Sequence, residues 1–172
     1  MKKVILIGYM AVGKTTIAQL LSEKNGVKYV DLDNLIEKKT NLSISELFKQ
    51  KGEIYFRKIE HEIFKDVIEN DENLIISTGG GTPCYADNHL FLNGKNRTSV
   101  YLKASLPFIL ERLKSEKKGR PLVANQSEEE LKDFVAKHLF ERSFFYNQAT
   151  FKVDVDDKKP EEIADEISAF LD

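Results

Sequence analysis

The residues from Gly8 to Thr15 constrain the fold of this chain most, because they fit the pattern G-x-x-x-x-G-K-[ST]. The run Val4 to Ile7 just before them is short, aliphatic and β-branched, as in a buried parallel strand. The apolar residues of 15–24 just after them have helical spacing. A glycine-bearing turn between a strand and a helix directs backbone N–H groups at a phosphate, and the helix adds its positive N-terminal end. The sequence therefore predicts a phosphate-binding loop.

Two residues of this loop have distinct expected roles. Lys14 supplies a positive charge for the β- and γ-phosphates, and the hydroxyl of Thr15 suits Mg²⁺. The alternative is an ordinary tight turn that happens to contain a lysine. The expected strand before the loop and the expected helix after it favour a nucleotide-binding loop. The residues of this segment expected to contact ATP are Gly8, Met10, Ala11, Val12, Gly13, Lys14, Thr15 and Thr16.

Strand-like and helical segments alternate along the rest of the chain. Further strands are expected at 27–33, 74–77, 99–102 and 151–155, and further helices at 34–39, 44–51, 53–69, 105–114, 127–146 and 160–171. This alternation predicts an α/β fold with a central five-stranded parallel sheet flanked by helices, in a single domain spanning 1–172. The polar segment 117–126 is expected to be a mobile loop.

Composition limits the partners and the compartment. The chain has 28 acidic and 26 basic residues, so its formal charge of −2 gives no electrostatic reason to expect nucleic acid or an anionic membrane. No apolar run approaches the ~20 residues of a membrane span. The single cysteine, Cys84, excludes an internal disulfide, so we expect a cytoplasmic protein. His61, His89 and His138 lack metal-ligand spacing and are expected to be surface or core residues.

Asp31 and Asp33 flank Leu32 at the end of the second expected strand. In an extended chain residues two apart point to the same side, so both carboxylates would face the edge where parallel sheets bind ligands. One would hold a metal through water, and the other would accept a hydroxyl proton as general base. A turn with a helix cap is the alternative for such a pair.

A glycine run and several arginines complete the candidate residues. Gly79, Gly80 and Gly81 follow the third expected strand and would let the backbone approach a ligand closely, although a plain flexible turn explains them too. Arginine suits planar anions because its fork donates two parallel hydrogen bonds. Taken one at a time, each candidate arginine is better explained as a solvated surface residue. These candidates are Arg57, Arg120 and Arg142.

Taken together, these residues resemble the shikimate kinase family over nearly the whole chain. The resemblance rests on Arg142 and five ordered blocks: Gly8 to Thr15; Asp31-Leu32-Asp33; Gly52-Glu53 with Phe56-Arg57 and Glu60; Gly79-Gly80-Gly81; and Gly119-Arg120-Pro121-Leu122. It implies a P-loop nucleoside-triphosphate-binding fold with a small substrate-binding insertion at 34–60 and a lid at 117–126. It also implies a monomer whose partners are small molecules.

The resemblance further implies transfer of the γ-phosphoryl group of ATP to the 3-hydroxyl of shikimate, in chorismate and aromatic amino-acid biosynthesis. Lys14, Asp33 and Arg120 would be the catalytic residues, and Thr15 and Asp31 would serve the Mg²⁺ cofactor. Shikimate would contact Asp33, Phe48, Phe56, Arg57, Gly79, Gly80, Gly81 and Arg142. Beyond the loop, ATP would contact Arg112, Arg120 and Lys159.

Two other functions stay open on the sequence alone. One is a kinase of the same fold that acts on gluconate or a nucleoside monophosphate. The other is a catalytically inactive nucleotide-sensing module, which the presence of Lys14, Asp33 and Arg120 disfavours.

The sequence departs from the common family pattern at three places. Leu32 replaces a small hydroxyl residue, Ala11-Val12 replace a Gly-Ser pair, and Phe144 replaces a proline. None of these changes removes a charged or phosphate-contacting group, so they bear on geometry and rate more than on activity.

Overall fold

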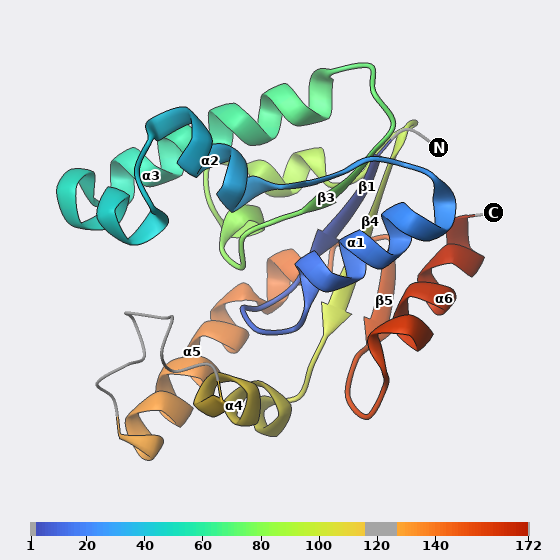
Figure 1. Ribbon diagram of the computed structural model, residues 1–172. Helices are drawn as coiled ribbons and strands as arrows, with labels where there is room; N and C mark the ends of the chain where they lie inside the picture. Colours follow the sequence, from blue (N-terminus) through green and yellow to red (C-terminus); the bar gives the residue numbers. More distant parts are fainter. Residues whose placement is uncertain (1–2, 116–126, 172) are drawn as a thin grey trace.

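The computed structural model describes residues 3–115 and 127–171 of the 172-residue chain. The expected lid, 117–126, and with it Arg120, lies outside the described residues. The described residues form one parallel five-stranded sheet in the order β2-β3-β1-β4-β5 (Figure 1), which confirms the expected fold class. Its strands are β1 (Lys3–Ile7), β2 (Tyr29–Asp31), β3 (Leu74–Ser77), β4 (Arg97–Lys103) and β5 (Phe151–Asp154).

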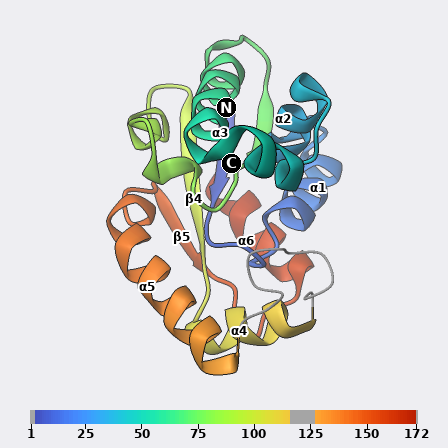
Figure 2. The ribbon, with the colours of Figure 1, turned by 90° about the vertical axis from the view of Figure 1, so that its left-hand side faces the viewer.

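Helices cover both faces of this sheet. In the part of the chain that the structure describes they are α1 (Lys14–Asn25), α2 (Leu32–Thr40), α3 (Ile44–Glu69), α4 (Leu106–Ser115), α5 (Glu128–Tyr146) and α6 (Pro160–Leu171), with two 3₁₀ helices, η1 (Thr82–Cys84) and η2 (Asn88–Phe91). Helices α1 and α6 lie together, α2 packs on α3, and α4 lies beside α5, as the two ribbon views agree (Figures 1 and 2). The 3₁₀ helices were not expected from the sequence.

The core consists of two apolar clusters, one on each face of the sheet. Val4 and Leu6 of β1 belong to the cluster under α1, α4 and α6, whereas Ile5 and Ile7 belong to the cluster under α2 and α3. Successive side chains of a strand point to opposite faces, so a strand covered on both sides is apolar throughout. The continuous run in β1 reflects this central, fully buried position.

The phosphate loop follows the central strand. β1 pairs with β3 on one side and with β4 on the other. Strands that follow β1 in the sequence therefore lie on both sides of it, and ligands of open parallel sheets bind at the carboxyl end of such a switch point.

The second strand covers 29–31 and not the expected 27–33, and the side chain of Asp31 ends it. Asp31 Oδ1 accepts hydrogen bonds from the backbone N–H groups of Asp33 at 3.0 Å and Asn34 at 3.3 Å, which makes Asp31 the N-cap of α2. Asp33 lies in the first turn of that helix. The expected extended conformation of the aspartate pair is therefore wrong, and the helix-cap alternative is confirmed for Asp31.

Helix α3 contains the two helices expected at 44–51 and 53–69. Gly52 divides them with φ 80° and ψ 172°, a conformation that glycine adopts readily and that other residues rarely do. A capping box between Ser43 and Glu46 starts the first part, and a capping box between Ser127 and Glu130 starts α5.

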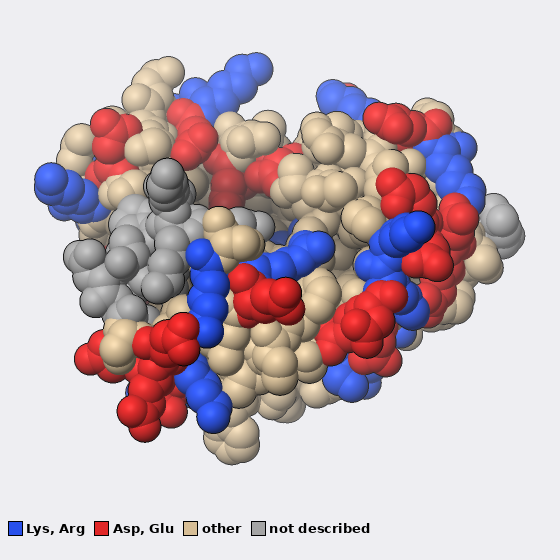
Figure 3. Space-filling view, turned by 60° about the horizontal axis from the view of Figure 1, so that its bottom comes forward, with Lys and Arg blue, Asp and Glu red and all other residues tan. Residues whose placement is uncertain are grey.

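Charged side chains of both signs are mixed on the molecular surface. On the face shown in Figure 3, Lys and Arg side chains lie beside Asp and Glu side chains. Examples of such pairs are Lys114 with Glu128 at 2.7 Å and Lys158 with Glu166 at 2.6 Å. Exposed pairs contribute little to stability, so burial of the two apolar clusters holds the fold. Among the described helices, none combines the length and apolarity needed to cross a membrane.

Candidate active site

The loop between β1 and α1 has the backbone shape of a phosphate cradle. Gly8, Ala11 and Gly13 all have positive φ, at 147°, 65° and 93°. A Cβ at Gly8 would lie 2.6 Å from the carbonyl oxygen of Leu102, so only glycine permits this close approach to β4. Ala11 holds the left-handed conformation with a side chain, which strains the backbone.

Lys14 lies at the start of α1 and points back into the loop. Its Nζ donates hydrogen bonds of 2.8 Å to the carbonyl oxygens of both Gly8 and Tyr9, and the residue is 9% exposed. The ammonium is therefore held at the centre of the loop, where a phosphate chain would lie.

Thr15 and Asp31 meet at the edge of this loop. Thr15 Oγ1 donates a hydrogen bond of 2.7 Å to Asp31 Oδ2 and lies 3.2 Å from the hydroxyl of Ser77. Hydroxyl and carboxylate oxygens are the ligands that Mg²⁺ prefers, and Mg²⁺ at nucleotide sites usually takes one or two protein groups with substrate phosphates and water. The oxygen donors at this point fit that ion.

A cavity of about 290 Å³ joins the phosphate loop to the carboxyl ends of β2 and β3. It is lined by Met10, Ala11, Gly13, Lys14, Thr15, Thr16, Asp31, Asp33, Ser77, Thr78, Gly79, Gly80 and Arg112. Three separate stretches of the sequence, the loop, the aspartate pair and the glycine run, thus share one cavity.

Asp33 is the most strongly perturbed carboxylate in this cavity. Its pKa is raised to about 6, chiefly by burial and then by the negative charges of Asp31 and Glu60, while Lys14 opposes the shift. A group with this pKa is about nine-tenths ionised at pH 7 and still accepts a proton readily.

The glycine run packs against charged side chains. A Cβ at Gly81 would lie 2.7 Å from Nη2 of Arg57, and one at Gly80 would lie 3.4 Å from Nη1 of Arg142. A Cβ at Gly79 would lie 3.5 Å from Oδ1 of Asp33. The run therefore brings both arginines and the aspartate close to the cavity, and any larger residue at Gly81 would displace Arg57.

Arg57 is held from several sides. Its Nη1 donates a hydrogen bond of 2.7 Å to Oε2 of Glu60, a residue that is 1% exposed. Its guanidinium carbon lies 3.9 Å from the ring centroid of Tyr85 and 5.0 Å from that of Phe56. The rings of Phe56 and Phe48 pack at 4.5 Å and form an apolar wall beside it.

Arg142 approaches the same region from α5. Its guanidinium carbon lies 5.4 Å from the ring centroid of Tyr9. Tyr146, one turn later, donates a hydrogen bond of 2.5 Å to the carbonyl oxygen of Gly80 and anchors this end of the helix. Both arginines thus border the glycine run from different helices.

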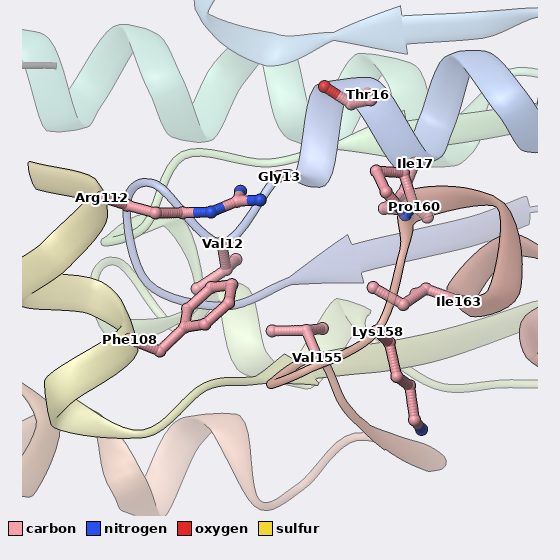
Figure 4. A pocket seen from close by; sticks show the side chains of 10 residues that line it. All are labelled: Val12, Gly13, Thr16, Ile17, Phe108, Arg112, Val155, Lys158, Pro160 and Ile163. Carbon is pink, nitrogen blue, oxygen red and sulfur yellow. The ribbon is translucent and has the colours of Figure 1, made fainter. Parts of the chain in front are cut away.

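A second, smaller hollow of about 50 Å³ borders the phosphate loop at Val12 and Gly13 (Figure 4). Arg112 and Phe108 of α4 lie at one side of it, and Pro160 and Ile163 of α6 at the other. Arg112 Nη1 donates to the carbonyl oxygen of Ala11 at 3.2 Å, and its guanidinium lies 4.8 Å from the Phe108 ring. The hollow is thus lined by an aromatic ring, aliphatic side chains and the cationic groups of Arg112 and Lys158.

Lys159, the lysine expected to contact ATP in this region, is not among the residues that line the hollow. Lys158 lines it, whereas Lys159 is exposed and its backbone N–H donates to Glu162 at 2.7 Å. Val12 and Thr16 also line the hollow, so it borders the phosphate loop and the start of α1.

Three residues of the site had no role assigned from sequence. Glu60 lies three positions after Arg57 on α3, a spacing at which opposite charges meet on a helix. The sequence therefore contained enough information to predict this ion pair. Thr82 donates a hydrogen bond of 2.6 Å to Oε1 of Glu60, and Tyr85 stacks on Arg57. Nothing local in the sequence indicated Thr82 or Tyr85, because their partners come from a distant helix.

Comparison with known proteins agrees with this geometry. The family model described as "Shikimate kinase" matches residues 10–172. A shikimate kinase from Flavobacterium johnsoniae is 54% identical over 171 residues, covering 99% of each protein. One from Flavobacterium psychrophilum is 48% identical over 171 residues, again covering 99% of each protein.

Solved structures give the same result. The crystal structure of shikimate kinase from Bacteroides thetaiotaomicron matches with a TM-score of 0.91 at 34% identity, covering 99% of this chain and 98% of that one. Shikimate kinase from Acinetobacter baumannii in complex with shikimate matches with a TM-score of 0.88 at 28% identity, covering 99% and 93%. The expected P-loop nucleoside-triphosphate-binding fold is thereby confirmed, and this chain belongs to the shikimate kinase family.

Proposed function

We propose that this protein transfers the γ-phosphoryl group of ATP to the 3-hydroxyl of shikimate, giving shikimate 3-phosphate and ADP for chorismate and aromatic amino-acid biosynthesis. The observation that carries the proposal is the shared cavity, in which Lys14 of the phosphate loop and Asp33 line one space. Phosphoryl transfer requires mainly positioning and charge stabilisation, and these groups supply both. Membership of the shikimate kinase family supports the choice of acceptor.

The nucleotide would lie along the phosphate loop. Backbone N–H groups of 8–16 and the Lys14 ammonium would bind its phosphates, and the hollow between Arg112 and Pro160 would take its base. Thr15 and, through water, Asp31 would hold Mg²⁺. When bound, that ion neutralises charge on the β- and γ-phosphates.

The acceptor would lie against the glycine run. Asp33 would take the proton of the attacking hydroxyl, a role for which a pKa of about 6 suits it at neutral pH. Arg57 and Arg142 would bind the acceptor carboxylate through charge-assisted hydrogen bonds, with Phe48 and Phe56 as an apolar wall.

Three further assignments rest on other grounds. The roles of Arg120 on the phosphates and of 117–126 as a lid rest on the family resemblance alone. The proposal of a monomer rests on the same resemblance. The single cysteine suits a reducing compartment, and we infer a cytoplasmic enzyme on that ground.

An acceptor screen tests the proposal. ADP formation would be measured with ATP and Mg²⁺ in the presence of shikimate, quinate, gluconate or nucleoside monophosphates, with Lys14→Met as the control for contaminating kinases. We expect shikimate to be the preferred acceptor and the control to be inactive. Preference for gluconate or a nucleoside monophosphate would assign the chain to another acceptor, and absence of turnover with every acceptor would support a sensing module.

A further inference from the structure

Tyr9 links the phosphate loop to α5. It is the second residue of the loop and is 1% exposed. Its hydroxyl lies 3.1 Å from Nδ1 of His138, which is four residues, or about one helical turn, before Arg142. Side chains at this spacing lie on the same face of a helix, so Tyr9 meets the face that carries the arginine.

The same ring also supports Arg142 directly. The guanidinium carbon lies 5.4 Å from the ring centroid of Tyr9, within the range of cation–π attraction. One side chain of the phosphate loop therefore contacts both the guanidinium and the helical turn that precedes it. Tyr146 fixes the following turn through the carbonyl oxygen of Gly80.

His138 also packs against a neighbouring ring. Its ring packs on that of Phe134 at 4.2 Å between centroids. Burial and then the positive charge of Arg142 lower its pKa, while the carboxylates of Glu141 and Glu53 oppose this and Lys137 adds to it. The neutral ring is therefore favoured at pH 7. Its Nδ1 shares one hydrogen bond with the Tyr9 hydroxyl, as acceptor in one tautomer and as donor in the other.

We propose that Tyr9 and His138 are positioning residues, which hold Arg142 in the orientation that binds the acceptor carboxylate. This inference rests on the proposed function, in which Arg142 is a carboxylate ligand. An arginine side chain has several rotatable bonds, and its affinity for a carboxylate falls when binding must first fix them. A buried ring on one side and a tied helical turn on the other restrict those bonds before the acceptor arrives.

The test removes each half of the contact separately. Tyr9→Phe deletes the hydroxyl and keeps the ring under Arg142, and His138→Leu deletes the ring nitrogen that bonds to it. Loss of one such hydrogen bond corresponds to about 2–10-fold, so we expect the KM for shikimate to rise by about that factor in both variants. The KM for ATP should stay within about twofold. His138→Asn places an amide group near the former Nδ1, which bonds to the Tyr9 hydroxyl through its oxygen or its nitrogen, and it should restore the KM for shikimate.

Two controls separate positioning from stability. Tyr29→Phe removes a hydroxyl that accepts a 2.8 Å hydrogen bond from Gln19 and does not line the cavity, so its KM values should not change. Thermal melting of all variants shows whether the fold is altered. A lower melting temperature with an unchanged KM for shikimate would make the contact merely structural and overturn the inference.

A double-mutant cycle with Arg142→Ala decides the mechanism. If Tyr9 acts through Arg142, Tyr9→Phe should have no further effect on the KM for shikimate once Arg142 is alanine. An equal effect in both backgrounds would overturn the positioning role. If Arg142→Ala alone leaves the KM for shikimate unchanged, the assignment of Arg142 in the proposed function fails, which is a separate outcome.

Discussion

Asp33 and Glu60 approach each other from different helices at Gly79. A Cβ at Gly79 would lie 3.5 Å from Oδ1 of Asp33 and 3.1 Å from Oε1 of Glu60, so the absence of a side chain there lets both carboxylates reach one space. The negative charge of Glu60 is one cause of the raised pKa of Asp33. Glu60 also accepts a hydrogen bond from Arg57. The buried carboxylate of Glu60 thus acts on both Asp33, the proposed base, and Arg57, which is proposed to bind the acceptor carboxylate.

Asp33→Asn should reduce kcat by about 10²–10⁴-fold and leave the affinity for ATP nearly unchanged, because asparagine keeps the shape but cannot accept a proton at neutral pH. Steady-state kinetics and nucleotide binding measure the two effects. An equal loss in both would place Asp33 at the metal instead.

The same variant should be more stable than the parent protein at pH 7. The folded-state pKa of Asp33 is raised from 3.8 to about 6, so ionisation of this carboxylate destabilises the fold progressively as the pH rises from about 4 to about 6. Asparagine avoids that penalty. Urea unfolding at pH 7 should show the gain, and a loss of stability would contradict the buried position of the carboxylate.

Activity should depend on the protonation of Asp33. We expect kcat/KM for shikimate to fall on the acid side of a pKa near 6, by about tenfold per pH unit well below it. Glu60→Gln removes a negative charge next to Asp33 and should move this acid limb of the pH profile to lower pH. Glu37→Gln is the matched control, since Glu37 is the weakest of the charges acting on Asp33 and should move the limb less. An unmoved limb in Glu60→Gln would assign the ionisation to another group.

Gly81→Ala should raise the KM for shikimate by about 10-fold or more, because the new Cβ would lie 2.7 Å from Nη2 of Arg57 and displace a charged ligand. Gly26→Ala is the matched control. Gly26 has φ of 63° and nothing within 4 Å of its Cβ position, so alanine there strains the backbone without touching the site. The control should lose stability and keep its KM values. Similar kinetics in both variants would remove Arg57 from the acceptor site.

Ala11→Gly should stabilise the protein by up to about 1 kcal/mol, because Ala11 holds φ of 65°, a conformation that is unfavourable for residues with a Cβ. Ala18→Gly, in the interior of α1, should instead destabilise it by about 1 kcal/mol or more. Chemical unfolding compares the two. A loss of stability in Ala11→Gly would show that other contacts of the methyl group outweigh the strain.

Local patterns in the sequence predicted the sheet, its helices and the phosphate loop. The G-x-x-x-x-G-K-[ST] pattern places Lys14 and Thr15 by the geometry of one turn, and the continuous apolar run of β1 indicates a strand buried on both faces. The break at Gly52 was also predictable, because a glycine separated two apolar helical patterns.

Contacts between distant segments were not predictable in this way. The conformation at Asp31 depended on whether its side chain would cap α2, and the alternation of side chains in a strand did not apply once the helix began. Tyr9 and His138 are 129 positions apart, and no local pattern joins them. The packing of α5 against the phosphate loop creates that contact, and with it the surroundings of Arg142.

Direct observation of the transferred phosphoryl group tests the proposed reaction most sharply. The protein would be incubated with ATP, Mg²⁺ and shikimate, and the phosphorus-containing products would be followed by ³¹P NMR, with Lys14→Met as the inactive control. We expect a phosphomonoester on the 3-oxygen of shikimate to appear in step with ADP, with little inorganic phosphate. Release of inorganic phosphate without that ester, or a phosphoryl group on another oxygen, would contradict the assignment of Asp33 and the glycine run to this acceptor.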